Sequence, residues 1–226
     1  MDNIWETLGR IYENGVFIYG TVLLVTYALL AIFSMISVRA YAKRDNVDQL
    51  NTLLSSPLAP GITVLAPAFN EGLTIIFNVR SLLTLNYPRY EIIIVNDGST
   101  DNSLEQMIEE FQLVPVDFAY NAKIQTKPVR KIYKSSNPAY AKLMVIDKVN
   151  GKSKADAVNA GINAAAYPHF VCTDVDCILD KNTLLELIKP VMQEEKKRVI
   201  ATGATLRIAN SCEFDQGVMT RMRPPR

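Results

Sequence analysis

The chain has 226 residues, of which 49% are apolar and 21% are charged, and its formal net charge is +1. This composition is typical of a globular protein, because disordered chains are poorer in apolar residues and usually more strongly charged. The near-zero charge disfavours a general nucleic-acid binder, and three cysteines without a C-x-x-C pair exclude a disulfide framework and a zinc finger. We expect Cys172, Cys177 and Cys212 to be small buried residues of a reducing compartment.

The first element along the chain is an uncharged segment from Gly15 to Val38. About 20 apolar residues cross a bilayer core, so this segment predicts one transmembrane helix in the cell membrane. Residues 1–14 contain three acids and one arginine, whereas three basic residues follow the segment from Arg39 onward. The positive-inside rule therefore places residues 1–14 outside and the rest of the chain in the cytoplasm. A cleaved signal peptide is the alternative, but no basic segment precedes this long apolar run.

Residues 39–60 are polar and contain two prolines, which indicates a linker. Residues 61–226 then alternate short aliphatic runs with helical apolar periodicity. Strands are expected at 61–66, 91–95, 143–146, 169–173 and 199–208, and helices at 73–83, 101–111, 155–165 and 183–195. This alternation predicts an α/β domain with a Rossmann-like, mostly parallel sheet and helices on both faces. Ligands of such sheets bind beyond the carboxyl ends of the strands.

Polar clusters follow the first two strands. The first has the sequence APAFNE, in which Asn70 has the alternative role of capping the next helix. The second has the sequence VNDGSTD, in which Ser99 or Asp101 can cap the helix that follows. Asp97 has no such structural explanation. A carboxylate held at a strand end can accept the N–H of an imide such as uracil.

A third cluster, NGKSKADAVNAG, occupies residues 150–161 at the start of a helix. It ends a basic stretch from Lys123 to Lys154 that holds nine lysines or arginines and one acid. Most of these cations are expected on a solvated face. Lys152 and Lys154 differ, because the N–H groups and macrodipole of a helix start already attract anions. We expect a diphosphate there.

The fourth cluster is the D-V-D run of Asp174 and Asp176, which directly follows an apolar strand. Two carboxylates so close together repel each other unless a cation lies between them. Oxygen ligands suit Mg²⁺ or Mn²⁺, whose other positions are filled by water and phosphate oxygens. The sequence therefore predicts a divalent-metal site at this strand end.

Two other enzyme classes share parts of these patterns. Residues 151–153 resemble the end of a phosphate-binding P-loop, but Ile146 stands where that loop requires its first glycine. Phosphatases of the haloacid dehalogenase type also carry a D-x-D after a strand, with the first aspartate as nucleophile. They place it near the start of the domain, whereas Asp174 comes late. Both classes are disfavoured.

Taken in order, the motifs APAFNE, VNDGSTD, KADAVNAGIN and DVD resemble those of the inverting family 2 glycosyltransferases with a GT-A fold. The resemblance covers about residues 60–210, and it is greatest to the membrane-anchored branch of poly-N-acetylglucosamine, hyaluronan and cellulose synthases. It implies a UDP-sugar donor and a glycan or other acceptor, in cell-surface or exopolysaccharide synthesis. It also implies a nucleoside pocket formed by Asn70, Glu71 and Asp97, with Asp97 on the uracil.

The same resemblance assigns the other half of the donor site. It implies that Lys154 and Asp156 hold the diphosphate and ribose side of the donor. Asp176 ligates Mg²⁺ or Mn²⁺, with Asp174 beside it against the sugar-diphosphate. The leaving UDP is thereby neutralised while the acceptor hydroxyl attacks the opposite face of the sugar.

Two features of the family are missing from this sequence. No Glu-Asp pair follows Asp176 to supply the general base, and the only tryptophan is Trp5, so there is no Q-x-x-R-W motif. We therefore expect residues 61–226 to be the donor-binding half of a longer transferase, incomplete at its C-terminus. The alternative is a membrane-tethered pseudoenzyme or regulatory module that binds a UDP-sugar without transferring it.

Overall fold

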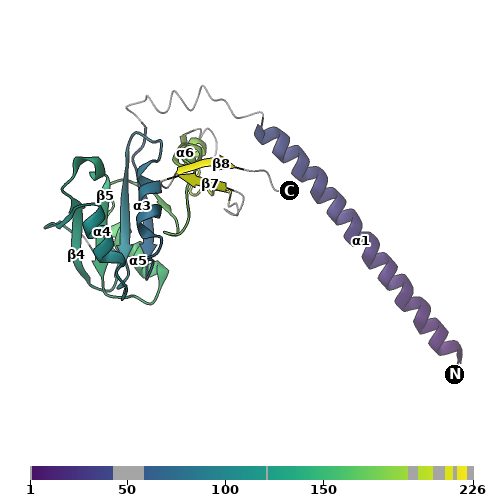
Figure 1. Ribbon diagram of the computed structural model, residues 1–226. Helices are drawn as coiled ribbons and strands as arrows, with labels where there is room; N and C mark the ends of the chain where they lie inside the picture. The colour runs from purple at the N-terminus through teal and green to yellow at the C-terminus, as the bar shows by residue number, and fades with distance from the viewer. Residues whose placement is uncertain are drawn as a thin grey trace. The chain divides into compact units, whose positions relative to one another are not determined.

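The computed structural model describes residues 2–42, 59–120, 122–192, 198–205, 212–215 and 218–222. The chain forms two compact units, Met1–Asn51 and Thr52–Arg226, both drawn in Figure 1.

The first unit is built on one long helix, α1, from Asp2 to Ala42. Its segment Leu8–Arg39 has a mean hydropathy of 2.3 and is entirely unburied, so it is long and apolar enough to cross a membrane. The hydroxyls of Thr21 and Thr26 donate to backbone carbonyls one turn earlier, which satisfies them in apolar surroundings. The predicted transmembrane segment lies within this helix, and residues 2–14 of the predicted short tail are helical as well.

The second unit contains a six-stranded sheet with the order β3-β4-β5-β2-β1-β6. Its strands are β1 (Ile62–Ala68), β2 (Tyr90–Asn96), β3 (Leu113–Pro115), β4 (Val129–Ser135), β5 (Leu143–Lys148) and β6 (His169–Cys172). The pairs β1–β2, β1–β6 and β2–β5 are parallel, whereas β3–β4 and β4–β5 are antiparallel.

One helix follows each of the parallel strands in the chain, and helices cover the sheet on both faces (Figure 1). They are α3 (Ile75–Leu83), α4 (Ser103–Glu110), α5 (Lys154–Ala164) and α6 (Thr183–Met192), with a short 3₁₀ turn, η1, at Pro138–Tyr140. The chain steps from β1 through α3 to β2, and from β2 through α4, β3 and β4 to β5. It then returns through α5 to β6 beyond β1. Because such crossovers are right-handed, α3 and α4 lie on one face and α5 on the other. This arrangement confirms the predicted fold class.

The core lies where β1 and β2 pack against α5. Leu65, Ile93 and Val95 point toward this helix and are fully buried. The helix presents small residues to them, and a Cβ added at Gly161 would lie 2.9 Å from the Leu65 side chain. The close approach of helix and sheet holds the carboxyl ends of β1 and β2 in a fixed relation to the first turn of α5.

Several sequence predictions differ from the structure. The strand predicted at 199–208 is absent over 199–205, and its last three residues lie outside the described part of the chain. A separate antiparallel pair, β7 (Cys212–Asp215) and β8 (Val218–Met222), was not predicted, nor were β3 and β4. In β4 only Ile132 is buried, so its largely polar sequence lacks the aliphatic run by which the central strands are found.

The expectation of buried cysteines is wrong for Cys172, which is exposed, and Cys177 is only partly buried. Cys172 lies on β6, the last strand at one end of the described sheet. Along this strand burial alternates, so that Phe170 and Cys172 are exposed. The strand is therefore not covered on both faces as β2 is.

Candidate functional site

The four predicted clusters follow β1, β2, β5 and β6, which are the parallel strands of the sheet. Their carboxyl ends therefore meet at one edge. Asn70 adopts a left-handed backbone conformation with φ of 56°, which asparagine tolerates better than most residues. Its Oδ1 accepts from Thr100 N at 2.8 Å, and its own N–H donates to Ser99 Oγ at 3.0 Å. Asn70 thus fastens the loop after β1 to the loop after β2, and it does not cap α3.

A second connection between these two loops passes through Glu71 and Asp101. The backbone N–H of Glu71 donates to Ser103 Oγ at 3.0 Å, and Asp101 Oδ2 accepts from Gly72 N at 2.9 Å. Asp101 Oδ1 also accepts from Ser103 N at 3.1 Å, so it satisfies a donor in the first turn of α4. The hydrogen bond from the Ser103 hydroxyl is the main cause that lowers the pKa of Asp101. The predicted nucleoside pocket is therefore bordered by a tightly bonded pair of loops.

Asp97 takes part in a buried ion network that the sequence alone did not predict. Lys148, the last residue of β5, is completely buried, and its Nζ lies 2.6 Å from Asp97 Oδ1 and 2.6 Å from Asp156 Oδ2. The same ammonium donates to Val149 O at 2.7 Å. Asp97 Oδ1 also accepts from Gly151 N at 3.0 Å. One cation thus joins the ends of β2 and β5 to the first turn of α5.

Two glycines allow these segments to approach so closely. Gly98 has a φ of +69°, and a Cβ placed on it would lie 2.7 Å from Asn150 N. A Cβ on Gly151 would lie 2.3 Å from Asp156 Oδ2. Both contacts are far shorter than a normal van der Waals separation. A side chain at Gly98 would push the loops after β2 and β5 apart, and one at Gly151 would displace the Asp156 side chain.

Asp156 carries a further contact, since it accepts from Lys127 N at 3.1 Å. Partial burial acts to raise the pKa of Asp156, but the hydrogen bonds from Lys148 and Lys127 outweigh it, so this pKa lies below its ordinary value. The carboxylate is therefore ionised at neutral pH and bridges the loop before β4 to α5.

Lys154 is the first residue of α5, at the helix start where the sequence predicted it. Its Nζ contacts Asp174 Oδ1, and this hydrogen bond is the main cause that raises the pKa of Lys154. Both side chains are about half exposed, so the pair is accessible from solvent. Lys152 precedes the helix in a left-handed conformation and is exposed.

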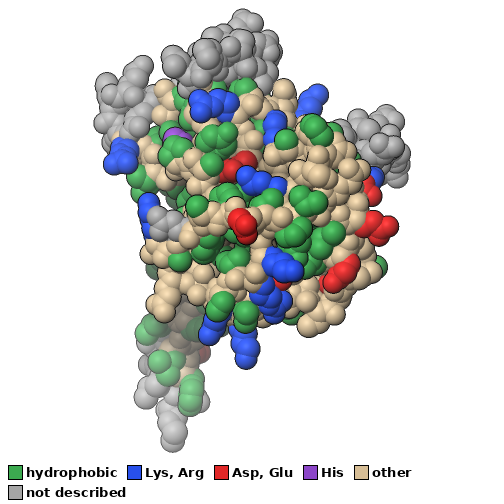
Figure 2. Space-filling view, turned by 90° about the vertical axis from the view of Figure 1, so that its left-hand side faces the viewer, with side chains coloured by type: hydrophobic (Ala, Val, Ile, Leu, Met, Phe, Trp, Pro, Cys, Tyr) green, Lys and Arg blue, Asp and Glu red, His purple; other side chains and the backbone are tan. Residues whose placement is uncertain are grey.

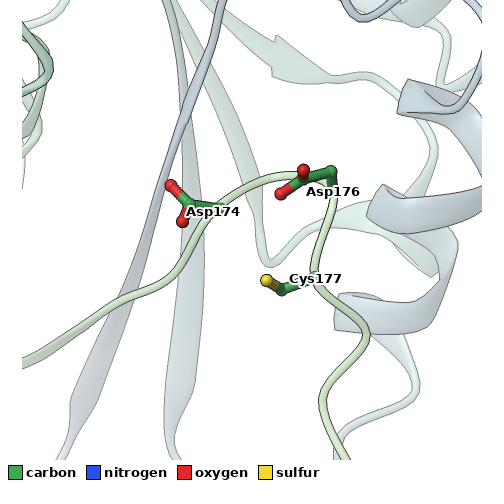
Figure 3. A group of neighbouring side chains, drawn as sticks. All are labelled: Asp174, Asp176 and Cys177. Atoms are coloured by element: carbon green, nitrogen blue, oxygen red, sulfur yellow. The ribbon is translucent and has the colours of Figure 1, made fainter. Parts of the chain in front are cut away.

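The D-x-D motif lies on the loop after β6. Ligand atoms of Asp174, Asp176 and Cys177 all lie within 4.8 Å of one another, and Figure 3 shows the three side chains along this loop. Burial is the main cause that raises the pKa of Cys177, which keeps the sulfur a neutral thiol. A neutral thiol is a poor ligand for a hard cation, whereas two carboxylates suit Mg²⁺ or Mn²⁺. The donor set fits the predicted metal through Asp174 and Asp176.

The basic stretch from Lys123 to Lys154 does not form one uniform charged face. Lys148 is in the interior, and Lys142 and Lys134 lie over the rings of Tyr90 and Phe118 at 3.8 and 5.2 Å from the ring centroids. On the side drawn in Figure 2, basic, acidic and hydrophobic side chains are intermingled. Lysines of this stretch therefore serve distinct contacts.

Comparison with known proteins gives the family. The profile of Glycosyl transferase family 2 matches residues 63–208. Poly-beta-1,6-N-acetyl-D-glucosamine synthase of Staphylococcus aureus (strain COL) is 28% identical over 166 residues, which are 74% of this chain and 32% of that protein. The synthase of Staphylococcus epidermidis (strain ATCC 35984) is 28% identical over 151 residues, 67% of this chain and 30% of that protein.

Solved structures give weaker matches. TarS 1-349 of S. aureus in complex with UDP-GlcNAc has a TM-score of 0.44 and 18% identity, over 67% of this chain and 39% of that one. The mannosyltransferase PcManGT from Pyrobaculum calidifontis, in complex with GDP-Man and Mn²⁺, has a TM-score of 0.44 and 21% identity, over 63% and 38% of the two chains.

The chain belongs to glycosyl transferase family 2, since the family profile covers most of its second unit. Its relatives in this family are glycosyltransferases, including the poly-beta-1,6-N-acetyl-D-glucosamine synthases named above. The chain spans about a third of the length of these curated relatives.

Proposed function

We propose that the second unit binds a UDP-sugar at the carboxyl ends of β1, β2, β5 and β6, as the donor half of an inverting glycosyltransferase that makes a cell-surface polysaccharide. The observation that carries this proposal is the convergence of Asp97, Lys154 and the D-x-D carboxylates on one edge of a family 2 domain. The Staphylococcus relatives are poly-beta-1,6-N-acetyl-D-glucosamine synthases, which supports a glycan as the acceptor.

The nucleoside is bound between the first two loops in this proposal. Asp97 accepts the imide N–H of uracil, and the pair of loops joined by Asn70 and Glu71 forms the wall of the pocket. Their mutual hydrogen bonds hold the wall in place before the nucleotide arrives, so less conformational entropy is lost on binding.

The diphosphate is bound at the start of α5. The backbone N–H groups of a first helical turn and the positive end of its dipole favour an anion, and Lys154 adds a solvent-accessible ammonium there. Asp156, in the same turn, is assigned to the ribose side in this proposal. Because Lys154 already contacts Asp174, this lysine and the D-x-D motif can meet the same phosphate group from two strand ends.

Asp174 and Asp176 would hold Mg²⁺ or Mn²⁺. When bound, the ion supplies positive charge that stabilises the diphosphate leaving group. The residues of this chain bind and orient the donor so that one face of the sugar remains open to an acceptor hydroxyl. The attacking hydroxyl gives its proton to a carboxylate base outside the motifs described above, and the anomeric carbon is inverted.

The long apolar helix supports a membrane-bound enzyme whose donor site faces the cytoplasm. Three basic residues follow the apolar segment, and this bias orients a span with its following domain inside. The alternative function, a membrane-tethered UDP-sugar-binding module, predicts binding of the donor without transfer. No Glu-Asp pair follows Asp176 in this sequence, so both functions predict no transfer by this chain alone. Sequencing the coding region beyond codon 226 separates them, because the transferase requires a Glu-Asp motif there.

Binding of UDP tests the proposed site directly. We expect calorimetry on the full chain in detergent to show that Mg²⁺ or Mn²⁺ strengthens UDP binding. Asp176→Asn should abolish this metal effect and leave weak metal-free binding. Loss of a charged partner costs about 1.5–3 kcal/mol, roughly a ten- to hundredfold loss of affinity.

Asp117→Asn is the matched control, because Asp117 is an exposed acid on the loop before β4. Mg²⁺ or Mn²⁺ should strengthen UDP binding by this variant as much as it does for the wild type. Equal UDP affinity of the wild type with metal and with a chelator would disprove the metal role of the D-x-D motif.

A further inference from the structure

We propose that Lys148 is the positioning residue of the nucleobase site: its ammonium fixes the Asp97 carboxylate so that one oxygen remains to select uracil over cytosine. This inference rests on the proposed function, because it concerns how the same site chooses its nucleotide. It assigns a role to the one completely buried lysine among the described residues.

Lys148 cannot itself be a ligand for the nucleotide. An ammonium has three N–H donors. In Lys148 they are directed to Asp97 Oδ1, Asp156 Oδ2 and Val149 O, at 2.6, 2.6 and 2.7 Å. With every donor satisfied and the side chain wholly buried, this lysine acts only through the groups that it holds.

The bonds to Asp97 leave its two oxygens unequal. Oδ1 accepts from both Lys148 Nζ and Gly151 N, and these two bonds fix the plane of the carboxylate. Both hydrogen bonds that Asp97 accepts within the described part of the chain end on this oxygen. Oδ2 is therefore the oxygen with capacity to accept a hydrogen bond from a ligand, and its direction is set by the two bonds on Oδ1.

The charge of Lys148 matters as much as its position. Asp97 and Asp156 are two carboxylates drawn onto one nitrogen, and without the cation they would repel each other. A carboxylate accepts hydrogen bonds and donates none. Uracil presents an N–H donor at the ring nitrogen where cytosine presents an acceptor, so a well-aimed Asp97 carboxylate favours uridine.

Lys148 also links the two halves of the donor site. Asp156 lies in the first turn of α5, two residues after Lys154. The lysine therefore sets the distance between the carboxylate proposed to read the base and the helix start proposed to hold the diphosphate. The affinity for donor ligands that span both subsites should therefore depend on Lys148.

The test is the ratio of the dissociation constants for CDP and UDP, measured by calorimetry on the full chain with Mg²⁺ present. Lys148→Met keeps an unbranched apolar side chain close in length to the lysine stem and removes the ammonium with its charge and donors. We expect it to lower the preference for UDP roughly tenfold or more, in keeping with the loss of a charged hydrogen-bond partner. Lys134→Met is the matched control, an exposed lysine on the neighbouring strand β4, and it should keep the wild-type ratio.

Lys148→Met leaves two carboxylates without their cation, so its folding is checked by thermal unfolding. The double variant Lys148→Met/Asp156→Asn removes one of these charges and is compared with Asp156→Asn alone. The preference for UDP should again be lower when Lys148 is missing. A folded Lys148 variant that keeps the wild-type ratio would overturn the positioning role. A wild-type protein that binds UDP and CDP equally would instead overturn the proposed base-reading function of Asp97.

Discussion

Among single residues, Gly98 is held under the strictest steric constraint in the candidate site. Its φ of +69° costs a residue with a Cβ about 1–2 kcal/mol, and the 2.7 Å approach to Asn150 N adds an overpacking term of about 1–3 kcal/mol. We therefore expect Gly98→Ala to lower the free energy of unfolding by about 2 kcal/mol or more, measured by urea denaturation.

Gly203→Ala is the matched control for this substitution. A Cβ at Gly203 meets nothing within 4 Å among the described residues, and its φ is not positive. The free energy of unfolding should then change by no more than about 0.5 kcal/mol. Equal effects of the two alanines would show that the loops after β2 and β5 are not in contact.

At the scale of elements, Asp101 couples the loop before α3 to the first turn of α4. Its pKa is lowered in the folded protein, chiefly by the Ser103 hydroxyl, so the folded state favours the ionised carboxylate. Its stabilising contribution is complete above the unfolded pKa of about 4 and is lost as the pH falls through the lower folded value. We expect the difference in melting temperature between wild type and Asp101→Asn to shrink from pH 6 to pH 3. Asp117→Asn, at an exposed acid, should show no such trend, and a pH-independent difference for Asp101→Asn would contradict this assignment.

At the scale of the whole molecule, the orientation of α1 decides whether the proposed donor site can meet cytoplasmic nucleotide sugars. We expect a phosphatase reporter that is active only outside the cytoplasm to be silent when fused after Arg44. Replacing Arg39, Lys43 and Arg44 by glutamine removes the charge bias and should raise the reporter signal. Strong activity of the unmodified fusion would invert the proposed topology.

The central strands and their connecting helices were predictable because their signals are local. β2 contains an unbroken aliphatic run that is buried throughout its centre, and α5 follows a clear helix start. The antiparallel strand β4 lacks this signal, because Ile132 is its one buried residue and its other residues are exposed or partly exposed. Residues 199–205 show the opposite error, since their apolar character predicted a strand that is not formed.

By itself, the sequence determined the order of the motifs, the family resemblance and the residue types at each strand end. Only the tertiary structure decided which atoms meet. Asp97 and Lys148 are separated by 51 positions, and Asn70 and Thr100 by 30, so no periodicity connects them. Their contacts depend on β2 lying between β1 and β5, an order set by the packing of α3, α4 and α5 on opposite faces of the sheet. From the sequence alone, Lys148 is expected to be a solvated charge, as lysines usually are. Only the packing of the tertiary structure buries it completely.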